Sequence, residues 1–384
     1  MKEKYKHMKK IKITLGIGIL SLGFLACNNV SHHKQEVTSL AKAFEGKFLI
    51  GAALNSAQIL GEDTAALKLV ASQFNSIVAE NSMKSEVLQP QAGVFDFTES
   101  DKLVELGQKN KAFVVGHNLV WHSQAPAWFF VDKEGNDVSR DTLIERMKNH
   151  IHEVVGRYRG KIKGWDVVNE ALNEDGSLRK SKFYHIIGPE YIELAFQFAH
   201  EADQDAELYY NDYNMYKPEK RKGAVHLIEN LKAKGLRVDA IGMQAHYGLN
   251  KDLTKEIEES IMAFANTGVK VMITELDVSV LPFPAEEITA EVSQSYQNKP
   301  EYNPYVEAVP DSIQKALADY YANLFKVYLK HNDKISRITF WGVNDSQTWR
   351  NYWPIEGRTD YPLLFDRNNQ PKPVYNTLIY LAKN

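Results

Sequence analysis

Cysteine is almost absent from this sequence: Cys27 is the only one among 384 residues, so no disulfide bond can form within the chain. An excess of either charge is also missing, because 46 basic side chains stand against 49 acidic ones, and this balance argues against a nucleic-acid or polyanionic partner. Beyond the N-terminal segment the sequence has no long apolar run, low-complexity tract or short repeat. The length would suit two or three average domains, but a single α/β barrel of this size is common.

The N-terminal 26 residues have the three parts of an export signal. Six lysines between Lys2 and Lys12 form a basic segment, and residues 13–26 form an apolar segment that is too short to span a bilayer as a helix. Ala26 supplies the small residue expected before a cleavage point. We therefore predict that residues 1–26 are a signal peptide and that the mature protein leaves the cytoplasm.

Cys27 directly follows this cleavage point. The run Phe24-Leu25-Ala26-Cys27 resembles the bacterial lipoprotein signal, in which the cysteine is lipidated and becomes the new N-terminus, although Phe24 stands where that signal usually has leucine. The prediction is an envelope lipoprotein, periplasmic or on the outer surface, with residues 27–44 as a lipidated tether and no other membrane contact. The alternative is a plain secretory signal with a free cysteine, and a secreted protein.

Short apolar runs alternate with longer amphipathic runs along residues 45–384. The runs that predict strands are Phe48–Leu54, Asn75–Ala79, Ala112–Gly116, Ile162–Val168, Glu207–Asn211, Ala240–Gln244, Val269–Thr274 and Arg337–Trp341. Several of the intervening helices carry ordinary signals, such as Pro189 and Pro218 in first turns and Gly235 and Gly268 after last turns. The pattern predicts a single-domain (β/α)₈ TIM barrel, an α/β fold, since parallel strands need helical crossovers and eight of them close.

Two predicted strands lead into a glutamate. The apolar run Gly164–Glu170 stops on Asn169 and Glu170, and the run Val269–Asp277 contains Glu275. In TIM barrels the chemistry lies at the carboxyl ends of the strands. Glycoside hydrolysis needs one carboxyl group to protonate the leaving oxygen and one to meet the positive charge that develops on the sugar. For either glutamate alone, a helix cap or a solvated loop position is the alternative interpretation.

The other strand ends bring polar and aromatic side chains to the same mouth. In chain order these are Glu80, Asn81, Lys84, His117, Asn118, Trp121, His122, Asn169, Asn211, Asp212, Tyr213, Gln244, His246, Asp277, Trp341 and Trp349. Residues two apart in a strand share a face, so Asp277 is expected beside Glu275 and His246 beside Gln244. A hydrogen-bonding histidine would keep a nucleophilic carboxylate ionised, whereas burial or a like charge would keep an acid partner protonated.

The pair His117 and His122 superficially offers two ligands to a zinc ion. Catalytic zinc usually has three protein ligands, and no third ligand of a recognised pattern follows in the sequence. Hydrogen bonding to sugar is therefore the favoured interpretation, and neither a metal nor another cofactor is predicted.

The motifs at the predicted strand ends stand in a specific order. They are Glu80-Asn81-Ser82-Met83-Lys84, His117-Asn118-Leu119-Val120-Trp121-His122, Trp165-Asp166-Val167-Val168-Asn169-Glu170, Gln244-Ala245-His246, Thr274-Glu275-Leu276-Asp277 and Trp341-Gly342-Val343. This series, from about Phe48 to Tyr375, resembles glycoside hydrolase family 10, the endo-β-1,4-xylanases. The resemblance implies a retaining double displacement on xylan or xylo-oligosaccharides, in which Glu275 attacks the anomeric carbon while Glu170 first donates and then removes a proton.

The same resemblance implies roles for the surrounding residues. Xylose units on the non-reducing side of the cut would be bound by Glu80, Asn81, Lys84, His117, Trp121, Gln244, Trp341 and Trp349. Tyr213 would lie toward the reducing side, and His246 and Asp277 would hold Glu275. Asn169 is expected to support the site and to hydrogen bond a sugar hydroxyl. The protein is expected to act as a monomer.

Residues 281–311 depart from this regular pattern. After Leu281 the chain carries a long segment rich in tyrosine and proline before the next predicted helix. Loops of this length are usually functional or mobile, so the insertion either shapes a subsite or merely covers the barrel.

Three other functions remain open at this point. The first is a barrel hydrolase that acts on another β-1,4-glycan, and the second is an enzyme that prefers short xylo-oligosaccharides to polymer. The third is a catalytically silent glycan-binding lipoprotein, which the presence of both Glu170 and Glu275 argues against.

Overall fold

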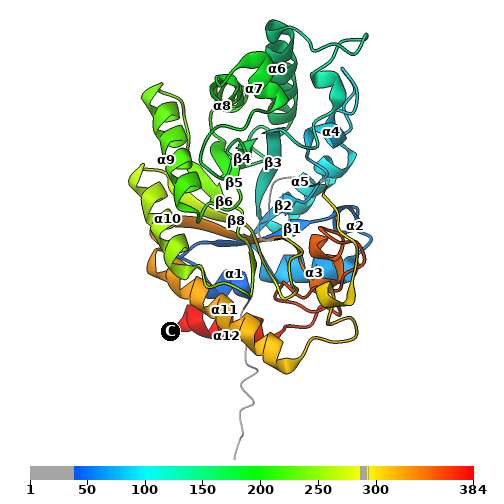
Figure 1. Ribbon diagram of the computed structural model, residues 1–384, viewed down its shortest axis with the longest axis vertical. Helices are drawn as coiled ribbons and strands as arrows, with labels where there is room; N and C mark the ends of the chain where they lie inside the picture. The colour runs from blue at the N-terminus through cyan, green and yellow to red at the C-terminus, as the bar shows by residue number, and fades with distance from the viewer. Residues whose placement is uncertain (1–38, 286–291, 293) are drawn as a thin grey trace, which may run out of the picture. The chain divides into compact units, whose positions relative to one another are not determined.

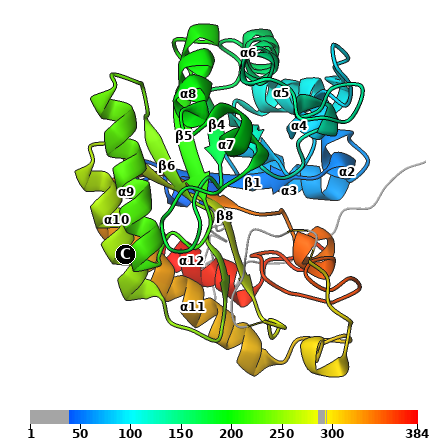
Figure 2. The ribbon, with the colours of Figure 1, turned by 45° about the horizontal axis from the view of Figure 1, so that its top comes forward.

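A computed structural model describes residues 39–285, 292 and 294–384. The predicted signal peptide and Cys27 lie outside these described residues. The described chain contains a closed ring of eight parallel strands, and the predicted (β/α)₈ barrel is confirmed. Figures 1 and 2 show helices packed around the strands. In order around the ring the strands are β1 (Leu49–Leu54), β2 (Ser76–Ala79), β3 (Phe113–Trp121), β4 (Gly164–Asn169), β5 (Glu207–Asp212), β6 (Ala240–Met243), β8 (Lys270–Ser279) and β9 (Ile335–Phe340). The pairing of β6 with β8 carries the ring past β7 (His246–Gly248), a short extra strand that pairs with the outer part of β8.

Long helices alternate with these strands and surround the ring. They are α3 (Thr64–Gln73), α5 (Thr98–Asn110), α6 (Arg140–Arg157), α8 (Tyr191–Ala202), α9 (Pro218–Ala233), α10 (Thr254–Asn266), α11 (Asp311–Lys330) and α12 (Pro373–Lys383). The short helices are α1 (Leu40–Ala43), α2 (Ser56–Ile59), α4 (Ser85–Leu88), α7 (Lys182–Ile187), η1 (Ala127–Phe129), η2 (Pro300–Tyr302), η3 (Asp345–Gln347) and η4 (Trp349–Asn351). Across the described ranges no helix combines the length and apolarity needed to cross a bilayer.

The folded domain begins earlier than the sequence predicts. Residues 39–44 were assigned to the tether, but Ser39 caps α1 by accepting a hydrogen bond from Lys42 N, and Leu40 and Phe44 are fully buried. The Phe44 ring stacks on Phe48 with a centroid distance of 5.2 Å. Since two large apolar side chains leave water here, residues 39–44 are part of the barrel domain.

Two strands extend beyond their predicted ends. β3 continues from Gly116 to Trp121, and β8 continues from Thr274 to Ser279. Each strand has a shift in pairing register inside this extension, next to His117 in β3 and next to Glu275 in β8. Such irregularities re-aim side chains, and they occur next to active sites. They explain how polar residues of the mouth can belong to strands.

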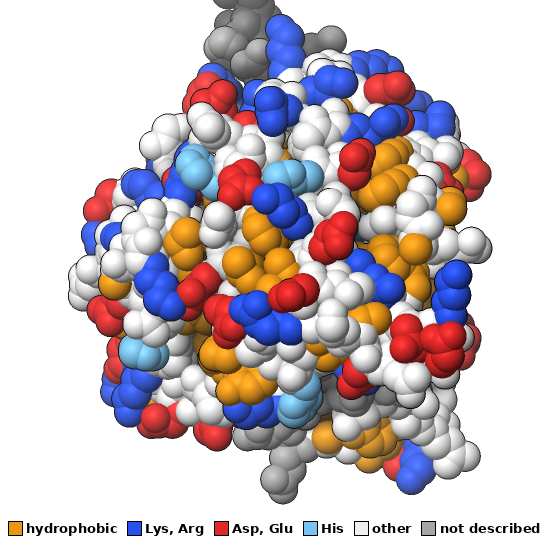
Figure 3. All heavy atoms as spheres, turned by 90° about the horizontal axis from the view of Figure 1, so that it is seen from above, with side chains coloured by type: hydrophobic (Ala, Val, Ile, Leu, Met, Phe, Trp, Pro, Cys, Tyr) orange, Lys and Arg blue, Asp and Glu red, His pale blue; other side chains and the backbone are white. Residues whose placement is uncertain are grey.

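The inside of the barrel is filled below the mouth. A compact group of inward-facing side chains comprises Ala53, Val78, Val115, Tyr209, Ala240, Met272 and Trp341. Glycines make room for the largest rings: a Cβ on Gly116 would lie 2.0 Å from the Trp165 ring, and one on Gly164 would lie 2.0 Å from the Tyr209 hydroxyl. The barrel is therefore a packed core that leaves space only at its mouth. On the face shown in Figure 3, basic and acidic side chains are interspersed.

Candidate active site

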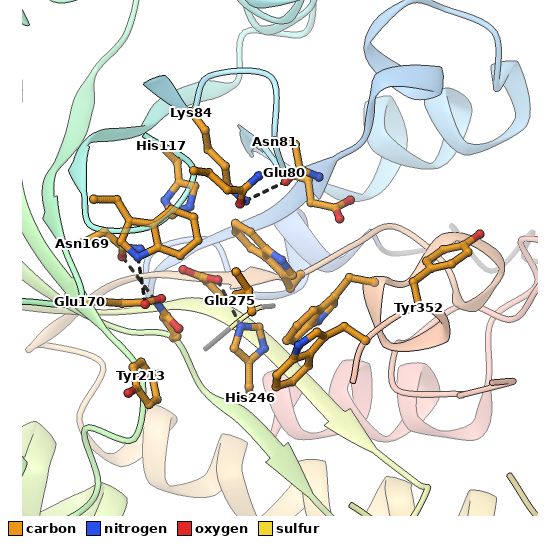
Figure 4. Close-up of a pocket in the computed structure, with 17 residues that line it drawn as sticks. Glu80, Asn81, Lys84, His117, Asn169, Glu170, Tyr213, His246, Glu275 and Tyr352 are labelled. Carbon is orange, nitrogen blue, oxygen red and sulfur yellow. Dashed lines mark hydrogen bonds and ion pairs between the residues drawn. The ribbon is translucent and has the colours of Figure 1, made fainter. Parts of the chain in front are cut away.

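A cavity of about 550 Å³ opens at the carboxyl ends of the strands. Its lining residues are Glu80, Asn81, Lys84, His117, Trp121, Gln124, Asn169, Glu170, Tyr213, Gln244, His246, Glu275, Val292, Trp341, Trp349, Tyr352 and Trp353. Figure 4 shows Glu170 and Glu275 projecting into this cavity from different walls, between Tyr213 at one end and Tyr352 at the other. All ten residues predicted to bind substrate line the cavity, together with both glutamates and His246.

Glu170 directly follows β4 and is almost completely buried, with 6% of its surface exposed. Its backbone has a left-handed conformation, with φ of 57°, and is fixed by two hydrogen bonds: Glu170 N donates to Asn211 O, and Arg179 Nε donates to Glu170 O. The carboxylate accepts hydrogen bonds from Trp121 Nε1 and Gln244 Nε2, both at 2.9 Å. The end of β4, the pairing with Asn211 of β5 and the guanidinium of Arg179 thus place this carboxyl group over the barrel.

The surroundings of Glu170 favour its protonated form. Burial is the largest cause that raises the pKa of this carboxyl group, and the negative charge of Asp212 raises it further. The hydrogen bonds from Gln244 and Trp121 oppose this change without overcoming it. A carboxyl group that keeps its proton toward neutral pH can act as a general acid.

Glu275 lies within β8 and is also almost completely buried. His246 Nε2 lies 3.2 Å from Glu275 Oε2, and Asn211 Nδ2 donates to Glu275 Oε1 at 2.8 Å. Burial acts to raise the pKa of Glu275, but the His246 hydrogen bond and the nearby His117 imidazole outweigh it, and the pKa is lowered. Glu275 is therefore held ionised, as a carboxylate nucleophile must be.

A row of charged groups behind Glu275 supports this state. His246 Nδ1 lies 3.1 Å from Asp277 Oδ2, and Arg350 donates to Asp277 Oδ1 through Nε at 3.1 Å and Nη2 at 2.8 Å. Burial alone would lower the pKa of His246, but the charge of Asp277 and the hydrogen bonds to both carboxylates raise it to about 9. Asp277 is fully buried behind His246 and does not line the cavity, so it contacts His246 and not the open space of the site.

Three amide side chains connect the two glutamates. Asn211 Nδ2 bridges Glu275 Oε1 and Asn169 Oδ1, at 2.8 and 2.9 Å. Gln244 Nε2 bridges Asn169 Oδ1 and Glu170 Oε1, at 3.3 and 2.9 Å. Because each of these side chains is also buried, the relative placement of the two carboxylates is set by a continuous network.

A second polar group lies on the wall formed after β2. Lys84 Nζ donates to Asn81 Oδ1 at 2.7 Å and to Gln124 Oε1 at 2.8 Å, and it lies 5.0 Å from the Trp121 ring centroid. Burial is the largest cause that raises the pKa of Glu80 and lowers that of Lys84, while their opposite charges oppose both changes. This wall offers closely spaced donors and acceptors of the kind that bind sugar hydroxyls.

Several supporting residues were not predicted from the sequence. His117 Nδ1 lies 2.8 Å from the buried Asp166 Oδ2, which fixes the ring at the cavity wall. The sequence places Asn211 at the mouth without a role, and it assigns none to Arg350, although both contact the carboxylates of the site. Asp166 is a polar residue within the apolar run of β4, and this pattern could have indicated a role in the site. No pattern in the sequence indicates such a role for Arg350, which lies in the loop after β9.

Five polar residues predicted at the mouth do not line the cavity, and three of them, Asn211, Asp212 and Asp277, are fully buried. Asn118 and His122 are absent from its lining, because the extension of β3 turns them away while His117 and Trp121 face inward. Within the described ranges, no three His, Cys, Asp or Glu side chains are grouped as a metal site would require.

The insertion after β8 packs against the loop that follows β9. Tyr296 N donates to Pro354 O at 3.0 Å, Asn303 Oδ1 accepts a hydrogen bond from Thr359 N at 2.9 Å, and Tyr361 Oη donates to Tyr305 O at 2.9 Å. Residues 286–291 and 293 of the insertion lie outside the described ranges. The remaining part braces the loop that carries Tyr352 and Trp353.

Comparisons with known proteins agree with this geometry. Endo-1,4-beta-xylanase A of Xylanibacter ruminicola is 51% identical over 334 residues, which cover 87% of this chain and 90% of that protein. The thermostable celloxylanase of Thermoclostridium stercorarium is 37% identical over 359 residues, covering 90% of this chain and 88% of the relative. A solved family 10 endoxylanase from a sugarcane soil metagenome superposes with a TM-score of 0.87 at 46% identity, covering 89% of this chain and 100% of that one. The profile of glycosyl hydrolase family 10 matches residues 39–380, and the chain belongs to this family.

Proposed function

We propose that this protein is an endo-1,4-β-xylanase that cleaves xylan with retention of configuration, with Glu275 as nucleophile and Glu170 as acid/base. The observation that carries the proposal is the pair of buried glutamates in one cavity, whose surroundings shift their pKa values in opposite directions. In a retaining enzyme the two carboxyl groups are expected about 5–5.5 Å apart.

The first step forms a covalent intermediate. The ionised Glu275 attacks the anomeric carbon, Glu170 gives its proton to the glycosidic oxygen, and the carbon–oxygen bond to the leaving sugar breaks. His246 and Asn211 hold the two oxygens of Glu275, so the attacking carboxylate is oriented before the sugar arrives.

The second step releases the sugar. Once Glu275 is esterified it no longer carries a negative charge, and that charge is one of the causes that raise the pKa of Glu170. The pKa of Glu170 therefore falls in the intermediate, which suits it to remove a proton from the attacking water. Water adds to the anomeric carbon, and Glu275 leaves as a carboxylate.

The cavity supports xylose as the sugar. Xylose lacks the exocyclic hydroxymethyl group of glucose, and the indole rings of Trp341 and Trp349 take up space along the cavity wall. A second candidate is activity on another β-1,4-glycan, which the name of the celloxylanase relative favours. Comparing initial rates on xylan and on a soluble cellulose decides between them, and equal rates would reject the preference for xylan.

The mechanism has its own test. Early product should carry the β configuration in proton NMR, and the α anomer appearing first would reject double displacement. Glu275→Ala should abolish turnover with little loss of binding. Glu170→Ala should retain activity on aryl xylobiosides with good leaving groups, because these need little proton donation, and lose it on xylan. Identical losses on both substrates would contradict the two roles.

We also propose that the mature chain is a monomer anchored to the bacterial envelope by lipid on Cys27. The basis is the N-terminal sequence alone. Mass spectrometry of the membrane fraction should find a lipid-modified N-terminal cysteine, and Cys27→Ala should move the activity to the soluble fraction. Size-exclusion chromatography with light scattering tests the oligomeric state.

A further inference from the structure

An exposed aromatic side chain stands at one end of the cavity. Tyr352 is 63% exposed and yet contributes to the cavity lining. In Figure 4 it lies on the side of Glu80 and Asn81, with Glu275 between it and Tyr213. An exposed ring that adjoins a binding cavity has a surface that a ligand can cover.

The backbone that carries Tyr352 is fixed at several points. Tyr352 N donates to Trp349 O at 2.9 Å, and the indole nitrogen of Trp349 donates to Asp277 Oδ2 at 2.7 Å. The side chain of the preceding Asn351 donates a hydrogen bond from Nδ2 to Asp345 O at 3.2 Å, and its Oδ1 accepts one from Asp360 N at 3.0 Å. The ring is thus presented by an ordered loop, and covering it requires little loss of backbone freedom.

The neighbouring aromatic rings extend the same wall toward the nucleophile. Trp353 stacks on Trp349 with a centroid distance of 4.9 Å and an interplanar angle of 13°, and Trp349 lies 4.8 Å from His246. On the far side, Trp353 contacts Phe283 of the insertion at 5.8 Å. The rings of Trp349 and Trp353 therefore extend an aromatic wall from His246 outward, and Tyr352 lines the same cavity.

We propose that Tyr352 forms an additional subsite, which stacks on a xylose unit farther toward the non-reducing end than the units bound at Glu80, Asn81 and Lys84. The proposal rests on the proposed function, since it extends the same xylan-binding cavity. The apolar C–H face of a pyranose matches the face of a tyrosine ring, and a neutral sugar needs no charged partner at this position. Chains that reach Tyr352 gain binding energy there, and shorter substrates do not.

The test compares a long and a short substrate on the full chain. For Tyr352→Ala, kcat/KM on xylohexaose should fall about tenfold, which corresponds to about 1.4 kcal/mol. On an aryl β-xylobioside the same variant should match the wild type, because that substrate occupies only the positions next to the cut. Tyr352→Phe keeps the ring and should behave like the wild type on both substrates.

A matched control separates local from general effects. Tyr380 on α12 is 69% exposed and does not line the cavity, so Tyr380→Ala should leave both rates unchanged. The cleavage position in reducing-end-labelled xylohexaose should move toward the non-reducing end in Tyr352→Ala, because binding registers that cover Tyr352 lose their advantage. An unchanged rate and cleavage pattern on xylohexaose would overturn the subsite, as would equal losses on both substrates. A wild-type enzyme that leaves both substrates intact would instead reject the proposed function, and the subsite with it.

Discussion

Replacing Asp277 by asparagine is the sharpest test of how the nucleophile is prepared. Asp277 is fully buried and receives hydrogen bonds from Trp349 Nε1 and from two nitrogens of Arg350, and it also contacts His246 Nδ1. Asparagine has nearly the same shape but no charge, and its amide nitrogen would face at least one of these donors. The substitution therefore removes the counter-ion of both Arg350 and His246.

The expected loss of stability is large. Arg350 is only 1% exposed, and a buried charge that loses its partner costs about 3–5 kcal/mol of unfolding free energy. The lowered pKa of Asp277 also indicates a stabilisation of the folded state on the order of a few kcal/mol. Burial would raise it, but Arg350 and His246 lower it from 3.8 to about 2, which corresponds to about 2 kcal/mol of stabilisation of the ionised form.

The pH dependence of this loss follows from the two pKa shifts. The pKa of Asp277 is lowered in the folded state, so its contribution is present above pH 3.8 and is lost as the pH falls through about 2. The pKa of His246 is raised from 6.5 to about 9, so its contribution is present below pH 6.5 and is lost as the pH rises through about 9. The difference in unfolding free energy between wild type and Asp277→Asn should therefore be largest between pH 3.8 and pH 6.5, where both contributions are present. It should shrink as the pH rises toward 9.

Activity should change in a way that stability alone does not explain. Without Asp277 the His246 imidazolium loses its support, so the pKa of Glu275 rises and the acidic limb of the kcat/KM profile moves to higher pH. Guanidinium unfolding and pH–rate profiles on an aryl β-xylobioside measure the two effects. Asp345→Asn is the matched control, since it leaves the buried Lys372 without its carboxylate partner but does not touch His246. In Asp345→Asn the acidic limb of the kcat/KM profile should stay where it is in the wild type. The same result in Asp277→Asn would refute the reasoning.

Two further predictions concern the acid/base and the barrel interior. Asp212→Asn removes a negative charge that raises the pKa of Glu170, so the alkaline limb of the kcat/KM profile should move to lower pH; an alkaline limb that moves upward would contradict this. Gly116→Ala should destabilise the fold by at least about 2 kcal/mol, because its Cβ would overlap the Trp165 ring. Gly156→Ala, in an open position on α6, should instead stabilise it by about 1 kcal/mol, and unfolding midpoints that rank these two variants in the opposite order would count against the packing argument.

The sequence predicted the barrel and the location of the site because both depend on local patterns. Each strand is a short apolar run, and the residue after such a run necessarily lies at the barrel mouth. The ends of β3 and β8 were predicted too early, since His117 and Glu275 were read as signs that the strand had stopped. Polar residues within a strand are compatible with continued pairing when a register shift aims them into the cavity, and single-sequence periodicity does not reveal such shifts.

The supporting contacts were harder to predict because they join distant parts of the chain. Arg350 and Asp277 are separated by 73 positions, and Asn211 and Glu275 by 64. No spacing rule connects such pairs, since their contact depends on the closure of the whole barrel. The tether boundary was missed for a similar reason: Leu40 and Phe44 look like linker residues until α1 is seen packed in the core.

The amide network between the two glutamates limits how protons can move. Carboxamide groups donate and accept hydrogen bonds, but unlike water, imidazole or a hydroxyl they do not readily hand a proton from one side to the other. Asn211, Asn169 and Gln244 therefore tie the two carboxylates together mechanically while insulating them from each other. The proton needed for the first half-reaction therefore stays on Glu170 until the glycosidic oxygen takes it, and Glu275 is not protonated by its neighbour between turnovers.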